Sequence, residues 1–381
     1  MSPEAPRILL VAGEASGDLH GAALVRELRR RRPEIEVYGI GGDYLRREGM
    51  HVLVDTSSVA TMGLTEIVGS AGRLVGAYRA MKRFLREEHP ALVVLIDYPE
   101  FNMMLAKYAK KLGVPVFYYV SPQVWAWRRG RIRKIADRVD RLGVVFPFEA
   151  DLYNQAGDAA AGRPLAVFVG HPLVESVRPQ RSAAETRQRH GLDPAAPLLA
   201  ILPGSRKKEI RALLAPALAA AARLQAEGWQ AVVALAHTLT EADLVEANDG
   251  RAVDVPVVSG DTYDLVHAAD AALVASGTAS LETALLGRPM VIMYRVSGLT
   301  YAIARRLIRV PFIGMPNLIL GRSVFPELVQ DDVTPENLVA AVHEVRARAG
   351  ELQSALEELG AALGPPGAAG RAADLALELI A

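Results

Sequence analysis

Short apolar runs alternate with longer amphipathic segments along most of the chain, which is typical of parallel sheets with crossover helices. In the first half, buried strands are predicted at Ile8–Ala12, Val37–Ile40, Leu92–Ile96, Val116–Val120, Leu142–Phe146 and Ala166–Val169. In the second half, they are predicted at Leu198–Leu202, Ala231–Leu235, Val255–Val258, Ala271–Val274 and Met290–Tyr294. Two such series predict an α/β protein of two doubly wound, Rossmann-like domains that face each other across a cleft.

The helices are predicted from apolar positions spaced about 3.6 residues apart. The longest runs from about Leu64 to Arg86, and shorter ones fall at about 212–227, 263–269, 279–286 and 299–307. After Pro335 the chain is rich in Ala, Leu and Glu and is expected to be helical to its end.

Domain boundaries follow from breaks in this pattern. The segment from Glu175 to Glu185 contains Pro179 and several polar residues, as an interdomain linker would. We therefore expect an N-terminal Rossmann-like domain at 1–175 and a C-terminal Rossmann-like domain at 176–345. Helices at 346–381 are expected to pack back on the first domain or on a partner subunit.

Composition excludes several classes of protein. The 381 residues hold 43 Lys+Arg and 43 Asp+Glu, a balance that argues against a nucleic-acid partner. The absence of cysteine excludes disulfides and thiolate chemistry, and is compatible with a reducing compartment. No apolar run is long enough to span a membrane, and the run at Ile8–Ala12 is too short for a secretory signal.

The residues directly after each strand carry the candidate chemistry, because ligands of such sheets bind beyond the carboxyl ends of the strands. Asp97 follows the strand Leu92–Ile96 and is the best-placed general base. The alternative, that Asp97 only caps the next helix, is less favoured.

The first strand ends in the small-residue turn 13–18, which includes Glu14, Ser16 and Gly17. This turn lacks the spacing of a dinucleotide or P-loop site, and taken alone it slightly favours a tight turn with Ser16 or Asp18 as helix cap.

An aromatic and basic segment follows the strand Val116–Val120. It contains Ser121, Trp125, Trp127 and Arg128. Aromatic faces suit sugar rings and Arg suits phosphate, so the segment is a candidate binding surface, although one Trp is expected to pack in the core.

Two strand-to-helix turns in the second half are candidate anion sites. One is Gly204-Ser205-Arg206, and the other is Ser276-Gly277-Thr278. Glu282, one turn into the following helix, is placed to accept hydrogen bonds from ribose hydroxyls. The alternative is a helix cap with Glu282 as its partner. The sequence has no Asp-x-Asp and its histidines lack ligand spacing, so we expect no metal and no cofactor.

These segments together resemble the lipid-A-disaccharide synthase family. The matching segments are Ala12–Asp18, Met62-Gly63, Ile96–Asn102, Val120–Arg128, Phe146–Glu149, Val169–Pro172, Leu202–Arg206, Ser276–Ala279 and Pro316–Leu318. The Trp-Ala-Trp-Arg segment and the Ala-Gly-Glu-Ala-Ser-Gly-Asp segment are highly specific, whereas the other turns would fit many nucleotide-sugar transferases.

The resemblance implies a GT-B glycosyltransferase of lipid A, and hence lipopolysaccharide, biosynthesis. Its substrates would be UDP-2,3-diacylglucosamine and the acylated sugar phosphate 2,3-diacylglucosamine 1-phosphate (lipid X). The reaction would give lipid A disaccharide 1-phosphate and UDP, with inversion at the anomeric carbon. The resemblance would place the acceptor site in the domain 1–175 and the UDP-sugar site in the domain 176–345.

The resemblance also implies roles for single residues. Asp97 would be the base, and Glu14 would share that task or orient the acceptor. Arg206 and the turn 276–278 would hold the diphosphate, Glu282 the ribose, and Asn317 would close over the donor from a loop. The remaining implied contacts are Gly204 and Ser205 for the UDP-sugar, and Ser16, Gly17, Asn102, Ser121, Trp125 and Arg128 for the acceptor.

Acylated substrates imply a cytoplasmic enzyme bound peripherally to the inner membrane. The helix 64–86 carries a row of cations beside its apolar stripe, namely Arg73, Arg79, Lys82, Arg83 and Arg86. It is a candidate membrane-surface helix, with an ordinary buried crossover helix as the alternative. A homodimer through the C-terminal helices is a further expectation.

Three alternatives stay open. The first is another UDP-N-acetylglucosamine transferase or 2-epimerase of the same fold. The second is a non-catalytic nucleotide-sugar-binding protein, in which Asp97 could change without consequence. The third is a nicotinamide dehydrogenase, which the missing glycine fingerprint disfavours.

Overall fold

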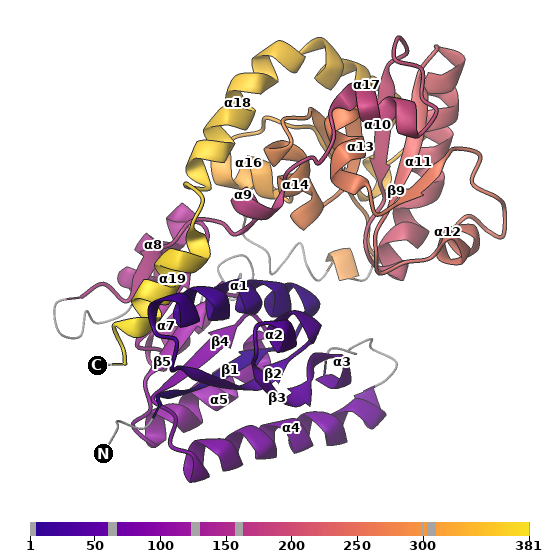
Figure 1. Ribbon diagram of the computed structural model, residues 1–381. Helices are drawn as coiled ribbons and strands as arrows, with labels where there is room; N and C mark the ends of the chain where they lie inside the picture. The colour runs from indigo at the N-terminus through magenta and orange to yellow at the C-terminus, as the bar shows by residue number, and fades with distance from the viewer. Residues whose placement is uncertain are drawn as a thin grey trace. The chain divides into compact units, whose positions relative to one another are not determined.

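The computed structural model describes residues 5–59, 67–122, 130–156, 163–298, 300–302 and 310–380. The chain forms two compact domains (Figure 1). The first consists of Met1–Pro172 together with Leu363–Ala381, and the second of Leu173–Ala362. The expected boundary at 175 lies three residues from the observed one, and the expected helical region 346–381 is divided between the two domains.

The first domain is built on a seven-stranded parallel sheet of order β3-β2-β1-β4-β5-β6-β7. Its strands are β1 (Arg7–Ala12), β2 (Glu36–Gly41), β3 (His51–Asp55), β4 (Leu92–Ile96), β5 (Val116–Tyr119), β6 (Arg141–Val144) and β7 (Ala166–Phe168). The apolar residues of β4 are completely buried, as expected for a central parallel strand covered on both faces.

Helices connect these strands. They are α1 (Ala15–Arg31), α2 (Asp43–Arg47), α3 (Thr56–Val59), α4 (Ile67–Glu87), α5 (Pro99–Lys111), α7 (Gly130–Ala136) and α8 (Pro147–Asn154). The last helix, α19 (Ala368–Leu377), lies against α1 (Figure 1). Arg31 of α1 pairs with Asp374, and Arg141 of β6 pairs with Glu378 at 2.6 Å, so the end of the chain is tied to the first domain.

The second domain holds a six-stranded sheet of order β10-β9-β8-β11-β12-β13. The strands are β8 (Leu198–Leu202), β9 (Gln230–Leu235), β10 (Val257–Ser259), β11 (Ala271–Ala275), β12 (Met290–Tyr294) and β13 (Glu327–Val329). The helices are α9 (Leu173–Ser176), α10 (Ala183–Arg189), α11 (Lys207–Ala226), α12 (Glu241–Ala247), α13 (Thr262–Ala268), α14 (Thr278–Leu285), α16 (Met315–Leu320), α17 (Pro335–Ala347) and α18 (Ala349–Ala362).

Each sheet reverses its winding direction at one point. In the first sheet the reversal lies between β1 and β4, and in the second between β8 and β11. In open parallel sheets, ligands bind at the crevice that such a reversal opens beyond the carboxyl ends of the strands. The turns after β1, β4, β8 and β11 are therefore the positions to inspect.

The predicted two-domain α/β fold is confirmed, with differences at the sheet edges. The sequence pattern missed β3, whose side chains are partly exposed, and β13, which is only three residues long. The predicted helix at 299–307 lies mostly outside the described residues. The expected linker 175–185 contains the end of α9 and the start of α10.

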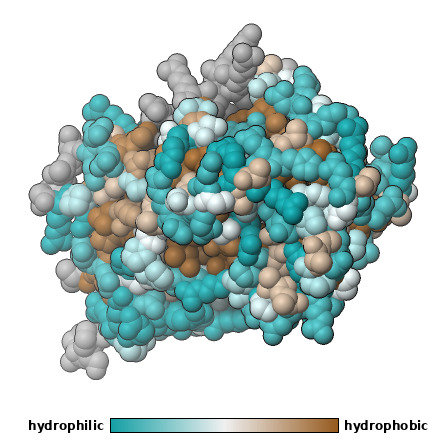
Figure 2. Space-filling view, turned by 90° about the horizontal axis from the view of Figure 1, so that it is seen from above, coloured by the Kyte–Doolittle hydropathy of each residue, from teal (hydrophilic) through white to brown (hydrophobic). Residues whose placement is uncertain are grey.

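The surface is mixed in character. Figure 2 shows one face on which hydrophilic residues predominate and apolar residues are exposed between them. Among the described residues, no helix is both long and apolar enough to cross a bilayer.

Candidate active site

Two carboxylates, Glu14 and Asp97, follow the neighbouring strands β1 and β4 at the winding reversal of the first sheet. β1 and β4 pair in parallel with Ala12 opposite Ile96, so the turns after them are neighbours. Burial raises the pKa of Asp97 to about 6, and the negative charge of Glu14 adds to the rise. The structure thus brings together the two carboxylates that the sequence singled out.

The backbone at Asp97 adopts an unusual conformation. Asp97 and Tyr98 have φ of 44° and 49°, in the left-handed region that non-glycine residues rarely occupy. Such residues cost about 1–3 kcal/mol each and persist only where their surroundings hold them. Two donors do so here: the hydroxyl of Tyr118 and the side-chain amide of Asn102, at 2.6 Å, both donate to the Asp97 carbonyl.

Gly13 makes room for this turn. A Cβ at position 13 would lie 2.3 Å from Cγ of the Tyr98 ring, well inside van der Waals contact. The turn after β1 and the turn after β4 therefore pack so closely that a side chain at position 13 would displace Tyr98. A requirement for glycine here follows from packing rather than from binding of a phosphate.

The residues expected to touch the acceptor fall into different environments. Ser16 is exposed in the first turn of α1, whereas Gly17 is buried near Ala12 and Ile96. Asn102 is fully buried, and its amide donates hydrogen bonds to the backbone carbonyls of Ile96 and Asp97. In this structure Asn102 therefore positions the turn after β4. Ser121 is also buried and donates to Glu149 Oε1 at 3.0 Å. Trp125 and Arg128 lie outside the described residues.

Two histidines of the first domain have strongly perturbed titration. Burial lowers the pKa of His20, in α1, to about 4. Burial and the proximity of His20 lower the pKa of His171, after β7, to about 3. Both imidazoles are therefore neutral at physiological pH. The proximity of the two histidines could not be predicted from the sequence, because 151 residues separate the two positions.

The first candidate anion turn of the second domain is occupied by the chain's own carboxylate. Glu209 Oε2 accepts hydrogen bonds from the backbone N–H of Ser205 at 2.9 Å and of Arg206 at 3.2 Å. Gly204 has φ of 127°, and a Cβ there would lie 2.5 Å from Cβ of Glu209. The Arg206 side chain is 78% exposed and lies 3.2 Å from Glu209 Oε1. The turn has the geometry of an anion site, filled by Glu209.

The second candidate turn leaves its helix start without a side-chain cap. Gly277 is the N-cap of α14 with φ of 146°, and no side chain bonds to this cap. Ser276 uses its hydroxyl to donate to the Ile313 carbonyl at 3.0 Å, so this hydroxyl is not aimed at a ligand. Thr278 is exposed. The turn therefore offers the positive end of a helix dipole.

Glu282 is a half-buried carboxylate with a tyrosine partner. Tyr263 donates to Glu282 Oε1 at 2.8 Å. Burial raises the pKa of Glu282, while Tyr263 and His237 oppose the rise. Tyr263 and His237 were missed from the sequence. His237 follows β9 by two residues, so the same strand-end rule that found Asp97 would have singled it out.

The expectation that Asn317 lies in a loop is wrong. Asn317 is part of α16 and has no exposed surface. Its amide donates to the Phe325 carbonyl and to Glu327 Oε1, both at 2.8 Å, and its oxygen accepts from Val324 N and Phe325 N. A side chain with all these partners fixes the segment before β13 and is a structural residue in this conformation.

The described residues contain no group of three or more His, Cys, Asp or Glu side chains that could hold a metal ion.

Comparison with solved structures identifies the fold. The chain is 12% identical to the S. aureus MnaA–UDP co-structure, with a TM-score of 0.63 over 96% of this chain and 94% of that chain. It is 14% identical to Acinetobacter baumannii MurG, with a TM-score of 0.57 over 98% of this chain and 99% of that chain. Both similarities support the GT-B arrangement of two Rossmann-like domains.

Comparison of sequences identifies the family. Residues 8–356 match the family model described as lipid-A-disaccharide synthetase. The chain is 45% identical over 380 residues to the lipid-A-disaccharide synthase of Myxococcus xanthus (strain DK1622), covering 98% of each chain. It is 46% identical over 382 residues to that of Syntrophus aciditrophicus (strain SB), covering 98% of this chain and 97% of the relative. The chain therefore belongs to the lipid-A-disaccharide synthetase family, and it is a hexosyltransferase of lipid A biosynthesis.

Proposed function

We propose that this chain transfers the sugar of UDP-2,3-diacylglucosamine to the 6-hydroxyl of 2,3-diacylglucosamine 1-phosphate, with Asp97 as the general base. The bond from the anomeric carbon to the acceptor oxygen forms as the bond to UDP breaks, and the hydroxyl proton passes to Asp97. The observation that carries this assignment is the half-buried carboxylate of Asp97, near Glu14, at the winding reversal of the first sheet.

The titration of Asp97 supports a base role. A general base works best when its pKa lies near the working pH, since it is then ionised yet still basic enough to accept a proton. A pKa of about 6 meets both conditions near neutrality. Glu14 contributes by raising the pKa of Asp97, and we assign it the task of tuning the base and orienting the acceptor.

The donor contacts are assigned to the second domain. The uncapped start of α14 at Gly277 and the exposed guanidinium of Arg206 would stabilise the charge that develops on the departing diphosphate. Glu282, held by Tyr263, would accept hydrogen bonds from the ribose. Glu209 now fills the turn at 205–206, and we propose that the donor binds beside it rather than in its place.

No step of this proposal uses a metal ion. Arg206 and the helix terminus supply the positive charge that a divalent cation supplies in other transferases. Activity in the presence of EDTA is therefore expected to equal activity without it.

We extend the proposal to the membrane surface through α4. Its apolar residues Met81 and Leu85 are fully buried, whereas Val75 is 46% exposed and Arg73, Arg79, Arg83 and Arg86 point to solvent. Lys82 lies over the ring of Tyr108 at 4.3 Å. One face of α4 thus packs as in an ordinary crossover helix, while the opposite face carries cations suited to anionic lipid.

Peripheral binding of a cytoplasmic enzyme to the inner membrane is tested with vesicles of phosphatidylglycerol. Co-sedimentation should fall several-fold when Arg73, Arg79, Arg83 and Arg86 are changed to Glu. Unchanged co-sedimentation would remove α4 from the proposal. The homodimer stays a prediction, tested by sedimentation equilibrium.

The deciding experiment mixes the full chain with both substrates in EDTA and follows UDP and disaccharide. Wild type should form both products in equal amounts. Asp97→Ala should bind UDP normally and form no disaccharide, whereas Arg206→Ala should bind UDP more weakly. Asp151→Ala, an exposed carboxylate on α8, is the matched control and should behave as wild type. Full turnover by Asp97→Ala would contradict the assignment of the base.

A further inference from the structure

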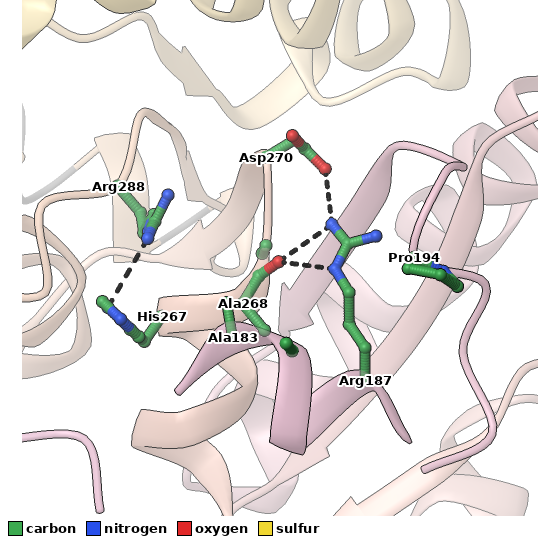
Figure 3. A pocket seen from close by; sticks show the side chains of 9 residues that line it. Ala183, Arg187, Pro194, His267, Ala268, Asp270 and Arg288 are labelled. Atoms are coloured by element: carbon green, nitrogen blue, oxygen red, sulfur yellow. Dashed lines mark hydrogen bonds and ion pairs between the residues drawn. The ribbon is translucent and has the colours of Figure 1, made fainter. Parts of the chain in front are cut away.

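A cavity of about 320 Å³ lies in the second domain, away from the residues assigned to catalysis. It is partly open to solvent and is lined by α10, the segment near Pro194, the end of α13 and the residues that precede β11 and β12. Figure 3 shows the pair Arg288–His267 and the pair Arg187–Asp270 on two sides of it, with Ala183 and Ala268 between them.

The cavity lies at the amino ends of the strands. Asp270 directly precedes β11, and Arg288 comes two residues before β12. The candidate donor turn 276–278 follows the carboxyl end of β11. A strand of this length spans roughly 16 Å, so the cavity and the donor turn are separate sites.

One of the two arginines is fully engaged in the fold. Arg187 donates to the carbonyls of Asp193 at 3.0 Å, Ala196 at 2.8 Å and Ala268 at 3.0 Å. It also pairs with Asp270 Oδ2 at 2.9 Å, which accepts in turn from Leu198 N. Arg187 and Asp270 therefore balance each other and fix the wall of the cavity.

Arg288 is different. Within the described part of the chain, no carboxylate lies within ion-pair distance of its guanidinium, and its polar contact is Nδ1 of His267 at 3.5 Å. Its Nε is buried and has no hydrogen-bond partner among the described residues. Burial lowers the pKa of Arg288, and the nearby Arg187 lowers it further against the opposing effect of Asp270. A partly buried cation with no carboxylate at ion-pair distance is unfavourable, and an anion in the cavity would stabilise it.

We propose that this cavity binds a small organic phosphate, with the phosphoryl group at Arg288 and the carbon skeleton against Ala183, Ala184 and Ala268. The planar guanidinium can donate two parallel hydrogen bonds to phosphate oxygens. The small alanine side chains leave room for a carbon skeleton of about the size of glycerol. The volume of the cavity is at the low end of the range for small-molecule sites. The chain thus carries a second anion site, distinct from the site of the diphosphate.

The test measures the thermal shift and the calorimetric affinity of the full chain for sn-glycerol 3-phosphate and for inorganic phosphate. Saturating UDP is present throughout so that the donor site is filled, and sodium chloride at matched ionic strength serves as the blank. Wild type should show a saturable rise in Tm. Arg288→Gln should bind at least about tenfold more weakly, a loss of about 1.4 kcal/mol. Arg251→Gln, an exposed arginine of the same domain, should keep the response of wild type.

A second variant guards against a folding defect in Arg288→Gln. Ala184 is exposed on α10 at the rim of the cavity, so Ala184→Glu places a carboxylate at the mouth of the cavity without disturbing the core. It should abolish the response to both phosphates. The proposal is overturned if wild type responds no more to phosphate than to chloride. It is equally overturned if acetate is as effective as phosphate, or if Ala184→Glu and Arg288→Gln keep the affinity of wild type.

Discussion

The hydroxyl of Tyr118, on β5, donates a hydrogen bond to the backbone carbonyl of Asp97, at the end of the neighbouring strand β4. Tyr118 is completely buried, so this bond is shielded from water. It links the proposed base to the centre of the sheet and helps to hold Asp97 at a φ of 44°. Tyr118 is therefore a positioning residue for the base.

Tyr118→Phe should lower kcat about tenfold and leave the KM for the UDP-sugar unchanged. The reason is that a misplaced base slows the chemical step without touching the donor. Stability should fall by about 1–2 kcal/mol, since a buried carbonyl loses one of its partners. Steady-state kinetics and urea denaturation measure the two effects. Tyr38→Phe, which loses a hydroxyl bonded to Glu36, is the matched control. A rise in KM at constant kcat would contradict the positioning role.

Asp97→Asn should abolish turnover and make the protein more stable at pH 8. Burial raises the pKa of Asp97 from 3.8 to about 6, so the folded state favours the neutral carboxyl. Above pH 6 the folded protein must hold a buried charge that the unfolded chain exposes to water, and stability is lost as the pH rises through 6. The asparagine removes this cost of about 2–3 kcal/mol.

The gain in stability from Asp97→Asn should grow from pH 4 to pH 7 and then level off. Urea denaturation at several pH values measures it. A gain that is equal at pH 4 and pH 8 would show that the ionised carboxylate is not what destabilises the wild type.

Gly13→Ala should lower both stability and kcat, because its methyl group would overlap the ring of Tyr98. The ring can move only by shifting the turn that carries Asp97. We expect a loss of about 1–3 kcal/mol and a kcat at least tenfold lower. Gly76→Ala in α4 is the control: a Cβ there meets nothing within 4 Å, so this variant should gain about 0.5–1 kcal/mol. Wild-type kcat in Gly13→Ala would contradict the coupling of the two turns.

The sequence predicted the elements whose patterns are strongest. Central strands such as β4 are buried on both faces and read as continuous apolar runs, and residues at their carboxyl ends are placed by the fold alone. This is why Asp97 and Glu14 were expected together. The edge strand β3 has exposed and half-buried residues in an irregular order, so its pattern was too weak to recognise.

Partners that come from distant segments could not be read from the sequence. Tyr118 and Asn102 meet the carbonyl of Asp97 only because β5 lies beside β4 and α5 begins directly after the turn. Asn317 was expected in a loop because it comes after the last pair of helices predicted before it. Yet Pro316 sits in the first turn of α16, a position that proline favours.

His20→Gln should make the protein less sensitive to acid. Burial lowers the pKa of His20 from 6.5 to about 4, so the folded state excludes a proton that the unfolded chain binds below pH 6.5. The stability that the neutral imidazole contributes is complete above pH 6.5 and is lost as the pH falls toward 4. Glutamine does not titrate, so the variant should lose less stability over this interval, by about 2–3 kcal/mol.

Urea denaturation of wild type and His20→Gln at pH 7.5 and pH 4.5 measures the difference. Equal losses in wild type and variant would contradict it, and His51→Gln, at the exposed sheet edge, is the control.

Glu209→Gln should tighten the binding of UDP several-fold while weakening the fold. Glu209 places a negative charge on the N–H groups of Ser205 and Arg206, close to where the diphosphate is proposed to bind. Glutamine keeps the length of the side chain and an acceptor oxygen for these N–H groups, but it removes the charge that repels the diphosphate and competes for Arg206. The neutral acceptor is a weaker helix cap, which should cost about 1 kcal/mol. Calorimetric titration with UDP in EDTA measures the affinity, and Glu241→Gln, in the first turn of α12, is the control. Weaker binding of UDP by Glu209→Gln would show instead that Glu209 orients Arg206 for the donor.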